Sequence, residues 1–359
     1  MANSRFGYVM HPVFSSNRQA LGFCALILAG LLSPLALRSI GYVPRPEVYW
    51  GITKEAGLYP FLGHQVFEEH EALDIAIVGS SLLLKGVDAP LLQVDLSRAL
   101  GRPAKVELLA AYWQGMDMQY ALLRDLLEHR HVGMVIMSMP IPQFNSNRPH
   151  VQAFRWLRFG EERDAIAGLP LASRTTLYAD AVLGTPRQFL SLLRPNEIDP
   201  RRAVSSTLGS EYDRAGYYGA PFLRERIDAP HPATWTMIYS GASHHLFDFH
   251  GPPLPPYQQH WVREIGKLLR EHHTPLTLLH VNDSEERGDL VVHERMFWPD
   301  LMQMPMLIVG VPTQTLFAKV PEDRFYNYFF DQHMNLNGKE LFTTTINPAL
   351  IKAYVEVQH

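Results

Sequence analysis

Short apolar runs alternate with segments of helical length along this chain, and the alternation restricts the fold more than any other feature. The first run, Asp74–Val78, contains β-branched residues and ends at a glycine, which is typical of a buried parallel strand. Further strands are expected at 105–109, 132–139 and 276–281, and 306–311 is either a strand or a short buried segment. Helices are expected at 89–100, 116–129 and 257–272. Strands separated by helices predict βαβ units, and hence an α/β fold with a parallel sheet.

The alternation lapses between about 141 and 256, where only two helical pieces are expected, near 152–166 and 175–193. A chain of 359 residues is long enough for two average domains or for one large α/β domain with an insertion. Because strands and helices resume after 256, we expect one α/β domain over 72–359 that carries an insertion at about 141–256. Asn337, with Glu340 three residues later, is expected to cap the last helix.

An uncharged apolar run, Ala20–Leu37, lies between Arg18 and Arg38. With its neighbours it approaches the ~20 residues that a helix needs to cross a bilayer. A buried soluble helix, a cleaved signal peptide and an uncleaved signal anchor are the three interpretations. The run has no polar face, and Ala36-Leu37-Arg38 is a poor cleavage site, so the sequence favours the anchor.

This interpretation divides the first 71 residues into three parts. Residues 1–18 form a short cytoplasmic N-terminus, 19–40 a transmembrane signal anchor, and 41–71 a juxtamembrane linker rich in proline, glycine and aromatic residues. Arginines flank the run almost equally, and the free amino terminus tips the orientation toward a cytoplasmic N-terminus. The body is then extracytoplasmic, which suits a chain whose single cysteine, Cys24, lies inside the apolar run.

Composition excludes several other functions. The net charge of −4 and the lack of a basic stripe argue against binding to nucleic acid. One cysteine excludes an intramolecular disulfide and a cysteine-based zinc site, and no phosphate-binding glycine motif is present. Three histidines, His244, His245 and His250, lie near Asp248, but such clusters arise by chance among 17 histidines. We therefore expect no metal and no cofactor.

Two polar clusters occupy positions where open α/β sheets bind ligands. Gly79-Ser80-Ser81-Leu82 follows the first strand, and Asp331-Gln332-His333 precedes the last helix. A glycine permits a tight turn, and a serine at the start of a helix can offer its own N–H group to an oxyanion. An aspartate two residues from a histidine can orient the imidazole as a general base, which then activates a serine hydroxyl. Together the two clusters predict nucleophilic serine chemistry.

The same residues resemble two motif blocks of the SGNH/GDSL hydrolase superfamily. Gly79-Ser80-Ser81-Leu82 resembles the first block, with Ser80 in place of the usual aspartate and Ser81 at the nucleophile position. Asp331-Gln332-His333-Met334-Asn335-Leu336-Asn337-Gly338 resembles the final block of membrane-anchored members. The resemblance covers about 72–140 and 257–345. It implies a three-layer α/β/α sandwich with a parallel sheet, and a catalytic set of Ser81, His333 and Asp331.

The resemblance also implies an oxyanion hole, but only two of its three donors match the family pattern. The amides of Ser81 and Gly115 correspond to the first two donors. The third donor of the family is an asparagine just after the third strand, where this sequence has Ser138-Met139-Pro140. The nearest asparagines, Asn145 and Asn147, are offset from that position, and Asn145 is the closer match.

The function implied is that of a membrane-anchored O-acyltransferase or esterase of a bacterial inner membrane, with its catalytic domain on the periplasmic side. It acts on acyl groups, acetyl above all, of a cell-surface polysaccharide through an acyl-serine. A membrane acyltransferase that supplies the acyl group is the expected partner. Because the third-block asparagine departs from the pattern, a catalytically inactive scaffold of a membrane polysaccharide-modification complex is the alternative.

Overall fold

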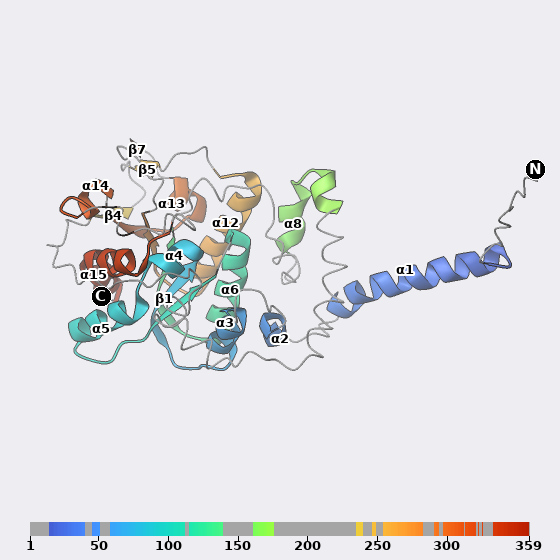
Figure 1. Ribbon diagram of the computed structural model, residues 1–359, viewed down its shortest axis with the longest axis horizontal. Coiled ribbons are helices and arrows are strands. Elements are labelled where there is room, and N and C mark those ends of the chain that lie inside the picture. The colour runs from blue at the N-terminus through green and yellow to red at the C-terminus, as the bar shows by residue number, and fades with distance from the viewer. Residues whose placement is uncertain are drawn as a thin grey trace, which may run out of the picture.

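The computed structural model, shown in Figure 1, is organised around a six-stranded sheet. The order of its strands is β2-β1-β3-β6-β8-β4. It describes residues 14–39, 45–50, 58–111, 115–138, 161–175, 235–239, 246–248, 254–282, 291–293, 297–311, 313–320, 322, 325 and 333–358. Five strands run parallel: β1 (Leu73–Gly79), β2 (Val106–Ala110), β3 (Val132–Ser138), β6 (Leu276–Leu279) and β8 (Met306–Gly310). The α/β class with a parallel sheet, expected from the alternation, is confirmed.

The carboxyl ends of β1, β2 and β3 lie level with one another. Gly79 of β1 is in register with Ala110 of β2, and Val78 is in register with Met137 of β3. Because all five strands are parallel, the loops that follow them emerge at one edge of the sheet.

Part of the expected insertion belongs to this sheet. Strand β4 (Trp235–Tyr239) pairs antiparallel with β8 and is the last strand on that side of the sheet. Strands β5 (Leu246–Asp248) and β7 (Val291–His293) form a separate antiparallel pair. Helix α8 (Glu161–Ala167) overlaps the end of the helix expected near 152–166, whereas most of 175–193 and the histidines His244, His245 and His250 lie outside the described residues.

The helices of the body fall into two groups. Helix α15 (Leu336–Gln358) contacts both α4 (Ser81–Gly86) and α5 (Ala89–Leu100), and all three helices contact the sheet. The other group consists of α3 (Leu58–Phe67), α6 (Met116–His129), α12 (Pro256–Glu271) and α13 (Phe297–Met302), each in contact with the next. The short helix α14 (Thr313–Leu316) follows β8.

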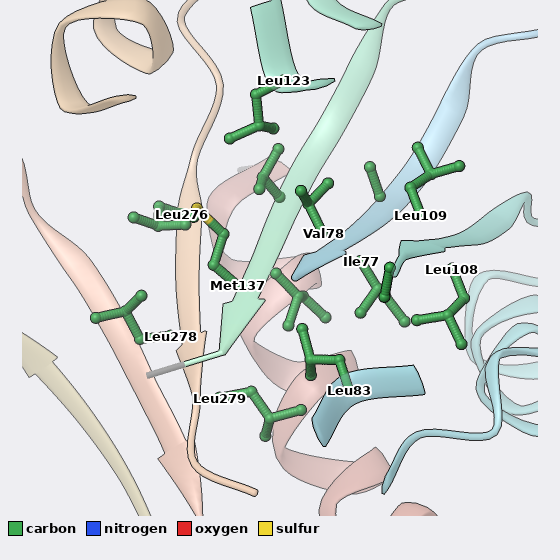
Figure 2. Close-up of a cluster of buried hydrophobic side chains, with 14 of the residues drawn as sticks. Ile77, Val78, Leu83, Leu108, Leu109, Leu123, Met137, Leu276, Leu278 and Leu279 are labelled. Atoms are coloured by element: carbon green, nitrogen blue, oxygen red, sulfur yellow. The ribbon is translucent and has the colours of Figure 1, made fainter. Parts of the chain in front are cut away.

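Buried leucines of helix α4 pack against the sheet, and Leu83 is the most deeply buried of them. Leu83 is fully buried in the same cluster as Ile77, Leu108 and Leu279, which come from three strands (Figure 2). A Cβ atom at Gly79 would lie 2.6 Å from Leu83 Cδ1, so a larger residue there would displace the side chain of Leu83. This packing sets the position of the residues between Gly79 and Leu83.

Local sequence signals explain the ends of α5, whose bounds match the expected helix. Asp88 Oδ1 accepts a hydrogen bond of 3.1 Å from the Leu91 amide and caps the first turn. Gly101 closes the helix in the left-handed conformation with φ 64°. The bounds of α6 also match the expected 116–129.

Two described parts of the segment 41–71, which we expected to be a linker, contribute instead to the core: 45–50 and 58–67. Helix α2 (Arg45–Trp50) and α3 contact each other, and Val48, Tyr49, Phe61 and Leu62 are fully buried or nearly so. The Arg45 Nε atom donates to both carboxylate oxygens of Asp125 in α6, at 3.0 and 2.9 Å. The Tyr49 hydroxyl donates to the same carboxylate at 2.6 Å. The packed body therefore begins at about Arg45 rather than at 72.

Helix α1 (Asn17–Ser39) forms over the apolar run and extends away from the body in Figure 1. Its apolar side chains at residues 21–33 are exposed, with Leu21 at 69% and Leu26 at 74% of full exposure, and Cys24 is exposed among them. Within the described part of the chain, no helix is both long enough and apolar enough to span a bilayer.

At the opposite end of the sheet from Ser81, α15 is joined to β1. The Tyr354 hydroxyl and Arg102 each donate to Asp74 Oδ1 at 2.6 Å, and the Lys105 amide donates to Oδ2 at 2.8 Å. Partial burial disfavours the charge of Asp74, but these hydrogen bonds outweigh it and hold the pKa of the carboxyl below its ordinary value. Burial and the hydrogen bond to Asp74 raise the pKa of Tyr354 to about 12.

Candidate active site

The serine expected to act as nucleophile stands at the first position of α4. Ser80 precedes the helix in an extended conformation, and Ser81 opens it directly after β1. The first N–H groups of a helix have no acceptor within the helix, so the amide of Ser81 is of the kind that can bind an oxyanion. Ser81 is buried, which keeps most of the bulk water away from its hydroxyl.

His333 reaches Ser81 from the other end of the chain. Its Nε2 atom lies 2.9 Å from Ser81 Oγ, a hydrogen bond between residues 252 positions apart. Distances of about 2.6–3.2 Å are those at which a histidine can take a proton from a serine hydroxyl. The structure thus brings together two of the three residues expected to form the catalytic set.

The turn before α15 holds His333 in place. The Asn335 amide donates to the Phe325 carbonyl at 2.9 Å, and Asn335 Oδ1 accepts from the Gly338 amide at 3.0 Å. Helix α15 starts at Leu336. Asn335 is therefore the cap, and the expectation that Asn337 caps this helix is wrong by two residues.

Gly338 is needed for the close approach of this turn to the preceding chain. A Cβ atom there would overlap the carbonyl oxygen of Phe325 and lie 3.0 Å from the Cβ atom of Met334. Any larger residue would force the first turn of α15, and His333 with it, to move.

Gly115 stands at the N-cap of α6, after β2 and at the same edge of the sheet as Ser81. Its amide, like that of Ser81, has no acceptor within its helix. Side chains from α12 and α6 support the turn: Gln258 Oε1 accepts from the Met116 amide at 3.3 Å, and the Tyr257 hydroxyl donates to Asp117 Oδ2 at 3.0 Å. Asp117 is fully buried, so the turn is held by polar groups shielded from water.

Three sequence candidates lie outside the described residues: Asp331, Asn145 and Asn147. At the end of β3, the hydroxyl of the buried Ser138 lies next to the turn at Gly79, 3.0 Å from where a Cβ atom of that glycine would be. At the end of β6, Asn282 Nδ2 donates to the Val311 carbonyl and to Thr313 Oγ1, both at 2.9 Å, and joins the loops after β6 and β8.

Sequence reasoning missed a set of polar residues on α15 that face α4 and α5. Lys339, Thr343 and Asn347 recur every four residues and are all buried. This spacing places them on one face of a helix, and it is the one signal in the sequence that could have found them. No feature of the sequence shows that the face is buried rather than in solvent.

The described residues hold no group of three or more histidine, cysteine or acidic side chains placed to bind a metal ion. At this edge of the sheet, the described residues offer a serine hydroxyl, a histidine imidazole and helix N-terminal amides.

No protein-family model matches the chain, and no curated protein does.

Proposed function

We propose that this protein is a serine-dependent O-acyltransferase or esterase of the SGNH/GDSL type, acting on acyl groups, above all acetyl, of a cell-surface polysaccharide. The observation that carries the proposal is the 2.9 Å hydrogen bond between His333 Nε2 and Ser81 Oγ at the carboxyl edge of a parallel sheet. A buried serine and a histidine from distant parts of the chain meet at the place where α/β folds bind their ligands.

In the first step, Ser81 Oγ attacks the acyl carbonyl carbon while His333 Nε2 takes the hydroxyl proton. The carbonyl oxygen becomes an oxyanion, and the amides of Ser81 and Gly115 donate hydrogen bonds to it. Asp331 orients the imidazole of His333 and stabilises its charge. The bond to the leaving oxygen then breaks, that oxygen takes the proton from His333, and the acyl group remains on Ser81.

In the second step, an incoming hydroxyl attacks the acyl carbon of the acyl-serine and gives its proton to His333. The bond between that carbon and Ser81 Oγ then breaks, and His333 returns the proton to Ser81 Oγ. Water as the acceptor gives hydrolysis, and a sugar hydroxyl gives transfer. The same protein groups serve both outcomes, so the exclusion of water from the acyl-serine decides between them. For transfer, a membrane acyltransferase would supply the acyl group.

The fold supports the proposal in two ways. Two groups of helices around a parallel sheet are what the expected three-layer α/β/α sandwich requires. The site also combines a serine that follows the first strand of the chain with a histidine that precedes the last helix, as the resemblance implies.

Membrane attachment through residues 19–40, with the body on the periplasmic side of a bacterial inner membrane, is a further part of the proposal. The exposed apolar side chains of α1 support it. A chain shortened by residues 1–44 should move from the membrane fraction to the soluble fraction and keep its turnover. Retention of the shortened chain in the membrane fraction would contradict attachment through this helix.

Labelling with a fluorophosphonate probe tests the nucleophile, because such probes react with activated serines. We expect the wild-type chain to be labelled and Ser81→Ala and His333→Ala to lose labelling. Ser80→Ala is the matched control: the adjacent serine is equally buried and its side chain makes no capping hydrogen bond. Labelling that survives Ser81→Ala, or that disappears in Ser80→Ala alone, would refute the assignment.

The alternative is a catalytically inactive scaffold of a polysaccharide-modification complex. The Ser81–His333 hydrogen bond favours the enzyme, because a scaffold has no need of it. Turnover of p-nitrophenyl acetate by the wild-type chain and its loss in Ser81→Ala would support the enzyme. Absence of both labelling and turnover in a folded wild-type chain would favour the scaffold.

A further inference from the structure

Helix α15 carries a stripe of three buried polar residues, Lys339, Thr343 and Asn347, which we call the α15 stripe. Each is at most 5% exposed, and each lies one helical turn after the previous one. Burying a lysine is costly unless its ammonium group is hydrogen-bonded. The stripe therefore needs an explanation beyond the packing of α15.

Four hydrogen bonds join the stripe to residues 84–95, which follow Ser81 in the chain. Lys339 Nζ donates to the Leu84 carbonyl at 3.2 Å. Thr343 Oγ1 donates to the Gly86 carbonyl at 3.4 Å and accepts from the Asp88 amide at 2.8 Å. One turn further on, Asn347 Nδ2 donates to Asp95 Oδ2 of α5 at 2.7 Å.

These contacts join the two elements that carry the reacting groups. Helix α4 is six residues long, with Ser81 at its start and the carbonyls of Leu84 and Gly86 at its end. Helix α15 starts three residues after His333. A hydrogen bond from the first turns of α15 to the end of α4 therefore limits how far Ser81 can move relative to His333.

We propose that Lys339 and Thr343 are positioning residues for the reaction, which fix α4 against α15 and so hold Ser81 Oγ at hydrogen-bond distance from His333 Nε2. The proposal rests on the proposed function. Apolar packing alone resists separation of the two helices but resists sliding less, because it is not directional. Hydrogen bonds at defined carbonyls fix the register, and a shift of about 1 Å in a catalytic pair can cost ~10²-fold in rate.

The sharpest test compares two threonines of the same helix. Thr343 and Thr345 are both fully buried or nearly so, but the Thr345 hydroxyl donates to the Leu341 carbonyl within α15 at 2.7 Å. Thr343→Val and Thr345→Val each remove one buried hydroxyl, and only the first removes contacts to the α4–α5 segment. We expect Thr343→Val to lower kcat for p-nitrophenyl acetate about tenfold or more with KM within about twofold. Thr345→Val should keep kcat within about twofold.

A second variant makes the test independent of threonine. Lys339→Met keeps the length of the side chain and removes its ammonium group, so the variant should fold. We expect slower fluorophosphonate labelling of Ser81 and a lower kcat, with KM again nearly unchanged. Circular dichroism and melting temperature verify that each variant is folded.

The outcomes separate the two proposals. An active wild-type chain whose Thr343→Val and Lys339→Met variants keep wild-type kcat overturns the positioning role and leaves the proposed function standing. Equal losses in Thr343→Val and Thr345→Val also overturn it, because any buried hydroxyl would then matter equally. A wild-type chain without labelling and turnover refutes the proposed function, and the positioning role falls with it.

Discussion

His333 Nε2 lies 2.9 Å from Ser81 Oγ, although the two residues are 252 positions apart in the sequence. The serine is presented by the first turn of a short helix after β1, and the histidine by the turn before the last helix. The second turn depends on Gly338, at which a Cβ atom would overlap the backbone carbonyl of Phe325. In the first turn, Gly79 leaves room for the side chain of Leu83.

Replacement of the base should abolish turnover while leaving the fold intact. We expect His333→Ala to lower kcat for p-nitrophenyl acetate by about 10³-fold or more, because the serine loses its proton acceptor. His272→Ala is the control, since that histidine is exposed at the end of α12. Comparable losses in the two variants would show that His333 has no special role.

Substitution of Gly338 should damage both stability and turnover. The added methyl group of Gly338→Ala would overlap the Phe325 carbonyl, so the first turn of α15 must shift. We expect a loss of about 1–3 kcal/mol in the free energy of unfolding and a lower rate of probe labelling at Ser81. Gly168→Ala is the matched control, because nothing lies within 4 Å of its added Cβ. The explanation fails if Gly338→Ala is as stable and as reactive as Gly168→Ala.

The pair formed by Arg45 and Asp125 should contribute strongly to stability. Burial raises the pKa of Asp125, and Arg45 opposes that rise. Arg45→Met leaves a buried carboxylate without its cation, and we expect a loss of about 3 kcal/mol in urea unfolding. The double variant Arg45→Met, Asp125→Asn should lose less than the sum of the two single variants.

A surface ion pair provides the comparison for this prediction. Arg98 and Asp95 lie 2.9 Å apart, with the arginine side chain 73% exposed. Arg98→Ala should change the free energy of unfolding by less than about 0.5 kcal/mol. A similar loss for Arg98→Ala and Arg45→Met would contradict the role of burial.

The hydrogen bond from Tyr354 to Asp74 should make stability depend on alkaline pH. The pKa of Tyr354 is raised to about 12 in the folded protein, against about 10 in an unfolded chain. The hydrogen bond therefore stabilises the fold fully below about pH 10, and this stabilisation is lost as the pH rises toward 12. We expect Tyr354→Phe to lose about 1–2 kcal/mol at pH 8 and the difference from wild type to shrink between pH 10 and 11. Urea unfolding across this range would contradict the prediction if the difference stays constant.

Sequence patterns predicted the parts of the fold whose signals are local. Asp88 and Gly101 mark the two ends of α5, and the apolar run before Gly79 marks β1, so these elements lie where we expected them. The meeting of Ser81 and His333 could also be predicted, because a parallel sheet brings the ends of its strands to one edge.

Features that depend on distant contacts could not be predicted. The segment around Tyr49 is rich in proline and glycine, and its burial depends on Asp125, 76 residues later. The choice between Asn335 and Asn337 as the cap of α15 depends on the hydrogen bond from Asn335 to Phe325. The burial of the α15 stripe could not be predicted for a similar reason, since that face of the helix is buried only because α4 and α5 pack against it.

The pairing of β3 with β6 across the insertion has a consequence for how the chain can be divided. A single peptide-bond cleavage between 176 and 234 would leave β1, β2 and β3 in one fragment and β4, β6 and β8 in the other. The β3–β6 ladder and the contacts of α15 with α4 and α5 would still join the halves. Ser81 would then belong to one polypeptide and His333 to the other, so the two fragments would be complementary halves of a single active site, neither of which carries the whole catalytic pair.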